Sequence, residues 1–207
     1  MATATVTRIT KTPHGDARVH LHAAAEPRGA LVLGHGAGGG VEAPDLIAAT
    51  AAAGSQGFSV ALVEQPYRVA GKRSSPAAKQ LDAAWITVVE DLRANEFDGV
   101  PLIAGGRSAG ARVACRTAEA TGATAVLCLA FPLQPPARVG KEPSPSRQPE
   151  LDAVKVPMLL VQGERDRFGM PTSGSRREVV VVAGDHSLRS DREAVRIAVE
   201  RWLAKLG

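Results

Sequence analysis

A serine, an aspartate and a histidine occupy positions where they could work together in nucleophilic catalysis. Ser108 is the centre of "GRSAG", residues 106–110, the one G-x-S-x-G pattern in the chain. Asp166 and His186 follow later, each just after an apolar run. A serine hydroxyl becomes an effective nucleophile when a histidine removes its proton and a carboxylate orients that histidine. We therefore predict Ser108, Asp166 and His186 as catalytic residues.

The surroundings of Ser108 strengthen this prediction. The apolar run "PLIAG" precedes the pattern, and the helical pattern "SAGARVACRTAEATG" follows it. Such a strand-to-helix turn exposes the serine hydroxyl, and the flanking glycines leave room for neighbouring elements. The helix would also direct its N–H groups and its positive end at the site. We expect the N–H of Ala109 to be one donor of an oxyanion hole.

A glycine-rich stretch, "LGHGAGGG" at residues 33–40, allows two interpretations. Gly34, Gly36 and Gly39 match the G-x-G-x-x-G dinucleotide fingerprint, and Glu64 would be the acidic residue that follows it. The next helical pattern, however, begins only near Pro44, whereas a dinucleotide loop leads directly into its helix. We favour an oxyanion loop whose donor is the N–H of Ala37. Dinucleotide binding through residues 34–39 stays an alternative.

The elements that must position these residues alternate along the chain. Two strands followed by alternating strands and helices indicate an α/β fold, with an eight-stranded, mainly parallel sheet flanked by helices. We expect one domain over residues 1–207. Strands are predicted at 4–10, 17–22, 29–34, 57–64, 100–105, 124–131, 157–162 and 178–183, and helices at 44–54, 75–95, 108–122 and 190–206. The last helix is expected to open with a capping box of Ser190 and Glu193.

Two connections depart from a regular alternation of strands and helices. Residues 132–156 contain six prolines and are expected to form an irregular surface excursion that is too short for a lid domain. Residues 166–177 leave little room for a helix between the last two strands. The predicted fold therefore has no lid domain and reduced helices between its last strands.

Composition argues against several classes of protein. The net charge of +4 comes from dispersed lysines and arginines, and aromatic residues make up only 3%, so no nucleic-acid surface is expected. No apolar run is long enough to span a membrane. Cys115 and Cys128 lack metal-ligand spacing, and His14, His20 and His22 are predicted to lie on an amino-terminal hairpin. We expect a cytoplasmic protein that uses no metal and no cofactor.

The segments "LGHGAGG", "GGRSAGARVA", "PMLLVQGERDRFG" and "GDHSL" occur in the order and spacing of an α/β-hydrolase. The chain resembles this superfamily over nearly its whole length. Within it, the chain is similar to small dienelactone-hydrolase-like proteins, including the testis-expressed hydrolase-like branch. The resemblance implies a Ser–His–Asp triad at Ser108, His186 and Asp166. Dienelactone hydrolase itself uses a cysteine nucleophile, so its substrate is not implied here.

These observations together predict a serine hydrolase. Its substrate would be a small carboxylic ester, thioester or lactone, cleaved through an acyl-enzyme on Ser108. A non-catalytic interaction protein with the same fold is the second hypothesis, because folds can outlive their activities. The sequence does not predict the oligomeric state or the biological substrate.

Overall fold

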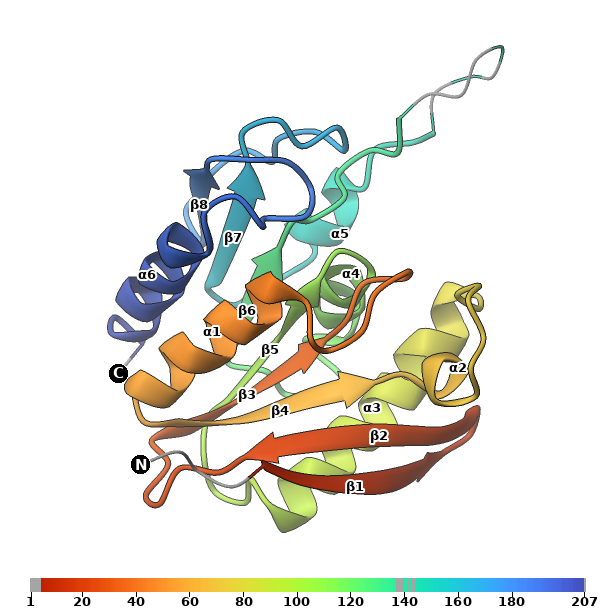
Figure 1. The fold of residues 1–207 in the computed structure, drawn as a ribbon, viewed down its shortest axis with the longest axis vertical. Coiled ribbons are helices and arrows are strands. Elements are labelled where there is room, and N and C mark those ends of the chain that lie inside the picture. The colour runs from red at the N-terminus through yellow and green to blue at the C-terminus, as the bar shows by residue number, and fades with distance from the viewer. Residues whose placement is uncertain (1–4, 137–139, 141, 143, 207) are drawn as a thin grey trace.

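The computed structural model describes residues 5–136, 140, 142 and 144–206. Within them, eight strands form a single sheet through the middle of the molecule (Figure 1). In chain order the strands are β1 Thr5–Thr12, β2 Gly15–His22, β3 Gly29–Gly34, β4 Phe58–Glu64, β5 Leu102–Arg107, β6 Ala125–Leu129, β7 Met158–Gly163 and β8 Arg177–Val182.

The sheet is parallel except at one edge. Its spatial order is β1-β2-β4-β3-β5-β6-β7-β8, and only the pairs β1–β2 and β2–β4 are antiparallel. The central strands β3, β5, β6 and β7 are almost entirely buried, which agrees with their continuous Val, Leu, Ile and Ala runs. Strands covered on both faces need no polar alternation, so the apolar runs specify a sheet with a helical layer on each side.

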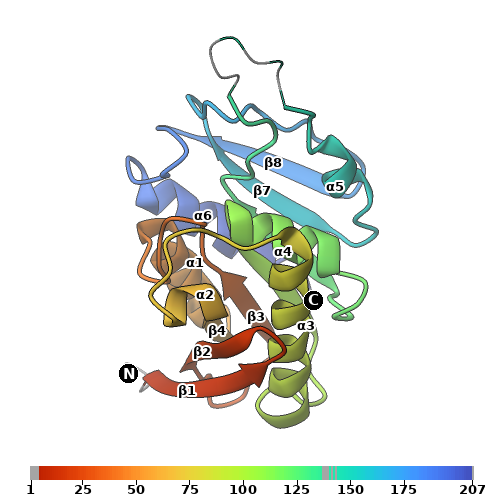
Figure 2. The same ribbon diagram turned by 90° about the vertical axis from the view of Figure 1, so that its right-hand side faces the viewer.

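Helices cover both faces of this sheet (Figures 1 and 2). One face packs against the helices near the two ends of the chain, and the other face against those from its middle. The first layer is α1 Pro44–Ser55 with α6 Arg192–Leu203, and the second contains α3 Ala78–Asn95 and α4 Ala109–Thr117; the short helices are α2 Pro66–Val69 and α5 Gln148–Asp152. Leu81, Trp85, Val88 and Leu92 form the buried stripe of α3, at the spacing that the sequence predicts.

The predicted fold class is confirmed. All eight predicted strands are present, and β7 and β8 are joined by turns without a helix. Among the described residues there is no separate lid domain. Residue 4 of the first predicted strand, and residues 137–139, 141 and 143 of the proline-rich excursion, lie outside the described part. The excursion returns to the sheet through the short helix α5.

Some predicted boundaries are wrong. Strand β5 runs over 102–107 rather than 100–105, because its two last glycines stay in the parallel ladder beside β3. The capping box of Ser190 and Glu193 does not form. Asp191 caps α6 instead, and its side chain accepts a hydrogen bond from the N–H of Ala194. Helix α4 ends at Thr117, five residues before the predicted end, and α3 begins at Ala78 rather than at Ser75.

Within the described part of the chain, no helix combines the length and the apolar character needed to cross a bilayer.

Candidate active site

Ser108 lies on a sharp turn between β5 and α4. Its φ of 52° and ψ of −108° are unusual for a residue with a side chain. The Ser108 N–H donates to the carbonyl of Leu129 at 2.9 Å, which ties the turn to β6. A Cβ at Gly106 would lie 2.6 Å from the carbonyl oxygen of Gly34, and a Cβ at Gly110 closer still. The flanking glycines therefore permit the close approach of β3 that holds this turn.

The structure brings the three predicted side chains into one hydrogen-bonded row. His186 Nε2 lies 2.9 Å from Ser108 Oγ, and His186 Nδ1 lies 2.8 Å from Asp166 Oδ2. A carboxylate can only accept, so Nδ1 donates to Asp166 and Nε2 accepts from the serine hydroxyl. The Asp166 carboxyl group is fully buried, whereas the His186 side chain keeps 19% of its surface exposed. The serine end of the row is the more exposed end, because Ser108 is half-buried whereas the Asp166 carboxyl group is fully buried.

The Asp166 carboxylate has further partners that sequence reasoning missed. Gln162 Nε2 donates to Asp166 Oδ2 at 2.8 Å, and the N–H of Phe168 donates to Oδ1 at 2.9 Å. The Phe168 ring lies against the His186 imidazole, with ring centroids 4.3 Å apart. Gln162 is the one polar side chain in the buried run "MLLVQ", and this polarity is the signal that could have found it. These contacts hold Asp166 although no helix follows β7.

The glycine-rich loop after β3 lies directly beside Ser108. Gly34 pairs with Gly106 in the parallel ladder, so the loop leaves the sheet next to the turn. A Cβ built on Gly36 would lie 3.6 Å from Ser108 Cβ. The predicted donor Ala37 therefore follows a glycine that lies beside the serine.

Two bonds set the orientation of this loop. The carbonyl of Gly36 accepts from His35 Nδ1 at 2.8 Å and from the N–H of Gly39 at 3.2 Å. In a trans peptide the N–H points opposite to the carbonyl, so the Ala37 N–H is directed away from the His35 ring. The Tyr67 hydroxyl donates to the Ala37 carbonyl at 3.0 Å. The loop is thus held from α2 as well as from within.

His35 has a structural place in this arrangement. Its Nδ1 donates to Gly36, and its Nε2 accepts from the N–H of Gln65 at 3.1 Å, which defines a neutral tautomer. Burial lowers the pKa of His35, and this agrees with an uncharged ring. The ring therefore fixes the glycine-rich loop against the end of β4.

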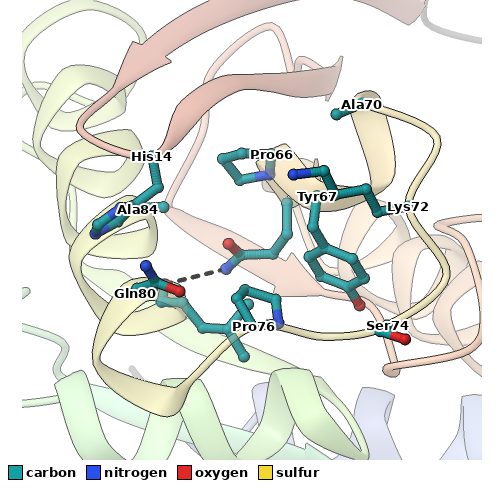
Figure 3. Close-up of a pocket in the computed structure, with 11 residues that line it drawn as sticks. His14, Pro66, Tyr67, Ala70, Lys72, Ser74, Pro76, Gln80 and Ala84 are labelled. Carbon is teal, nitrogen blue, oxygen red and sulfur yellow. Dashed lines mark hydrogen bonds between the residues drawn. The ribbon is translucent and has the colours of Figure 1, made fainter.

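Tyr67 also lines a cavity of about 190 Å³ (Figure 3). Figure 3 shows Tyr67, Lys72 and Ser74 on one side of it and His14, Gln80 and Ala84 on the other. Its walls come from the β1–β2 turn, α2, the loop after α2 and the first turns of α3. Tyr67 thus forms part of the cavity wall while its hydroxyl holds the glycine-rich loop.

The remaining candidates have other partners. The Glu64 carboxylate bonds to His20 at 2.7 Å and to Arg18 at 3.3 Å across the sheet, and these groups lower its pKa against the effect of burial. Cys115 and Cys128 are buried free thiols with sulfur atoms 3.5 Å apart. In the described residues, no group of three His, Cys, Asp or Glu side chains could hold a metal ion.

A family model described as an alpha/beta hydrolase domain matches residues 27–202. The chain belongs to the α/β-hydrolase family. The match covers the glycine-rich loop, the serine turn and both later loops, so the superfamily predicted from the sequence is confirmed. Among curated protein sequences, none matches this chain.

Solved structures of other α/β-hydrolases have the same fold. An α/β serine hydrolase homologue from Coxiella burnetii has a TM-score of 0.75 at 16% identity, covering 98% of this chain and 99% of that one. A lidless α/β serine hydrolase from Xanthomonas campestris has a TM-score of 0.70 at 20% identity, covering 98% and 96%. A dienelactone hydrolase from Anabaena variabilis has a TM-score of 0.72 at 13% identity, covering 99% and 98%.

Proposed function

We propose that this α/β-hydrolase cleaves a small carboxylic ester, thioester or lactone through an acyl-enzyme on Ser108. The observation that carries the proposal is the row from Ser108 Oγ through His186 to Asp166, with distances of 2.9 and 2.8 Å. These distances suit proton transfer, and the row starts at a strained strand-to-helix turn. Family membership supports the same reaction class.

In the first half-reaction, Ser108 Oγ attacks the substrate carbonyl carbon while His186 Nε2 takes the serine proton. Asp166 keeps Nδ1 protonated and stabilises the imidazolium that forms. Collapse of the tetrahedral intermediate breaks the bond to the leaving group, which receives the proton from His186. The products of this step are the acyl-enzyme and a free alcohol or thiol; a lactone keeps its new hydroxyl on the acyl chain.

In the second half-reaction, a water molecule replaces the leaving group. His186 takes a proton from the water, whose oxygen attacks the acyl carbon. The new tetrahedral intermediate then releases the carboxylic acid, and the proton returns from His186 to Ser108. The enzyme ends in its starting protonation state.

The negative charge of both intermediates needs donors next to Ser108. We assign these roles to the N–H groups of Ala37 and Ala109. Ala109 is the first residue of α4, where helix amides lack intrahelical acceptors and the helix dipole is positive. Ala37 would come from the glycine-rich loop, which leaves the sheet beside the serine turn. Donors at these positions would stabilise charge that develops only in the transition state.

Labelling with a fluorophosphonate tests the proposal most directly. The probe should label the wild-type protein once, on Ser108, and should fail to label Ser108→Ala. Ser144→Ala is the matched control, because Ser144 is exposed and, among the described residues, its carbonyl alone makes a hydrogen bond. Labelling of the Ser108→Ala protein at wild-type rate would contradict the proposal. A wild-type protein that resists the probe and every ester in a panel would favour the interaction protein.

The dinucleotide alternative has less support. Helix α1 begins at Pro44, so its amino end is not part of the glycine-rich loop. The Glu64 carboxylate, which would bind a ribose, already bonds to Arg18 and His20. This alternative predicts that NAD(H) or NADP(H) raises the melting temperature, because a ligand that binds only the folded state stabilises it. We expect no shift.

We further propose a cytoplasmic location. The support is the pair of free, closely spaced thiols of Cys115 and Cys128, which a reducing compartment would preserve. The proposed partner is a small-molecule ester, with no metal and no cofactor in the reaction.

A further inference from the structure

Arg107, the residue before the serine, joins three segments around the candidate site. Its Nε lies 2.8 Å from Asp45 Oδ2, in the first turn of α1. Its Nη2 donates to the main-chain carbonyl of His186 at 3.0 Å. Its Nη1 lies 2.8 Å from the place of a Cβ on Gly36, so the guanidinium also lies against the glycine-rich loop. Two of these contacts reach segments that contribute to the site, the His186 loop and the glycine-rich loop, and the third anchors the guanidinium on α1.

The partner of Arg107 is an unusual carboxylate. Asp45 is completely buried, and burial raises its pKa while the charge of Arg107 opposes this rise. Its other oxygen, Oδ1, accepts from the N–H of Leu46 at 3.0 Å. Taking two charges out of water rarely gives a net gain in stability over apolar side chains of similar size. A buried pair beside a catalytic turn is therefore better explained by the geometry that it imposes.

That geometry concerns the loop that carries His186. Strand β8 ends at Val182, so the sheet no longer holds the backbone at the histidine. Asp185 organises the loop locally by accepting from the N–H and hydroxyl of Ser187. The bond from Arg107 attaches this loop to the serine turn itself. Because this bond is made to the main-chain carbonyl, it fixes the position of the His186 backbone rather than the rotamer of the imidazole ring.

We propose that Arg107, anchored by Asp45, is a positioning residue that holds the His186 backbone at the distance the serine requires. The inference rests on the proposed function of Ser108 and His186. A misplacement of about 1 Å at a reacting group can cost about 100-fold in rate. Only a planar guanidinium can reach Asp45 with one nitrogen and the His186 carbonyl with another, so lysine is a poor substitute.

A second arginine pair offers a matched control. Arg116 binds Asp82 through two bonds of 2.8 and 2.6 Å, and both side chains are about one-fifth exposed. This pair joins α4 to α3, and Arg116 also lies 3.5 Å from Glu150 in α5; among the described residues, no hydrogen bond or ion pair joins either side chain of the pair to the serine turn. Substituting either arginine by methionine removes a guanidinium that ties separate segments of the chain together. Only the change at Arg107 affects the His186 loop.

The experiment compares Arg107→Met with Arg116→Met on a neutral short-chain ester. We expect both substitutions to lower the melting temperature. Arg107→Met should lower kcat about 100-fold with KM within about threefold, whereas Arg116→Met should keep kcat within about threefold. Arg107→Lys should recover only part of the loss. Methylguanidinium in the buffer should raise the rate of Arg107→Ala several-fold and leave Arg116→Ala unchanged.

A readout without turnover separates this inference from the proposed function. The proton on His186 Nδ1, bonded to Asp166, should give a downfield resonance in the wild type and in Arg116→Met. That resonance should be absent or broadened in Arg107→Met. An inert wild-type protein that shows this pattern would contradict the proposed hydrolase and leave the positioning role standing.

Other outcomes would overturn the inference. An Arg107→Met enzyme with kcat within about threefold of wild type and an unchanged resonance would exclude a positioning role. A rise in KM confined to esters that carry a carboxylate, with kcat unchanged, would make Arg107 a substrate-binding residue instead.

Discussion

Gln162 and His186 donate to the same oxygen of Asp166, each at 2.8 Å. Gln162 is fully buried and also donates to the carbonyl of Gly169, so its amide group is fixed. One oxygen of the buried carboxylate thus accepts from a neutral, fixed amide as well as from the histidine. This relationship explains how a loop without a following helix keeps the acid in place.

Replacing Gln162 should loosen the position of the Asp166 carboxylate without removing the carboxylate. We expect Gln162→Met to lower the free energy of unfolding by about 1–3 kcal/mol, because a buried carboxylate oxygen loses one partner. The rate should fall about tenfold, since Asp166 keeps the N–H of Phe168 and the bond to His186. Chemical denaturation and steady-state kinetics measure the two effects. An unchanged kcat in a folded variant would show that the Gln162 bond is dispensable.

The oxyanion role of Ala37 can be tested by removing its N–H. Ala37→Pro deletes this donor, and we expect a loss of about 10²–10³ in kcat, equivalent to about 2.7–4 kcal/mol, with a much smaller change in KM. Ala37→Gly keeps the N–H and serves as the control. Circular dichroism and melting temperatures must match before the rates are compared. Full activity in a folded Ala37→Pro protein would remove Ala37 from the oxyanion hole.

Esters with short acyl chains should be the better substrates. The chain has seven aromatic residues and no lid domain in its described part, so little apolar surface is available to enclose a long chain. We expect kcat/KM for a butanoate ester to exceed that for the dodecanoate ester of the same alcohol. The reverse order would show that the protein has an acyl-binding surface of another kind.

The buried His35 should make stability depend on pH. Its folded-state pKa lies below the ordinary value of about 6.5, so the unfolded chain binds protons more readily. Its contribution is complete above pH 6.5 and is lost as the pH falls through the folded-state pKa. Melting temperatures between pH 7.5 and 5 should drop less for His35→Asn than for wild type. Parallel curves for the two proteins would contradict this account.

Local patterns in the sequence predict the candidate catalytic residues and the fold class. Ser108, Asp166 and His186 each follow an apolar strand, and in a parallel sheet the carboxyl ends of such strands share one edge. The turn at Ser108 is likewise local, because its glycines and the adjacent strand and helix are neighbours along the chain. Such features depend on residue type and short-range periodicity, which can be read before folding.

The tertiary structure decides what holds these residues in place. Arg107 and Asp45 are 62 positions apart in the chain, and they meet because β3 and β5 are adjacent in the sheet. Neither local sequence pattern predicts this pair. In the sequence, Gln162 is one residue of a strand, and only the folded structure shows that its side chain donates to Asp166. Asp191, rather than Ser190, caps the last helix, because the Asp191 side chain is the one that accepts from the N–H of Ala194. Contacts between distant side chains depend on sheet order and loop path, which short-range patterns do not encode.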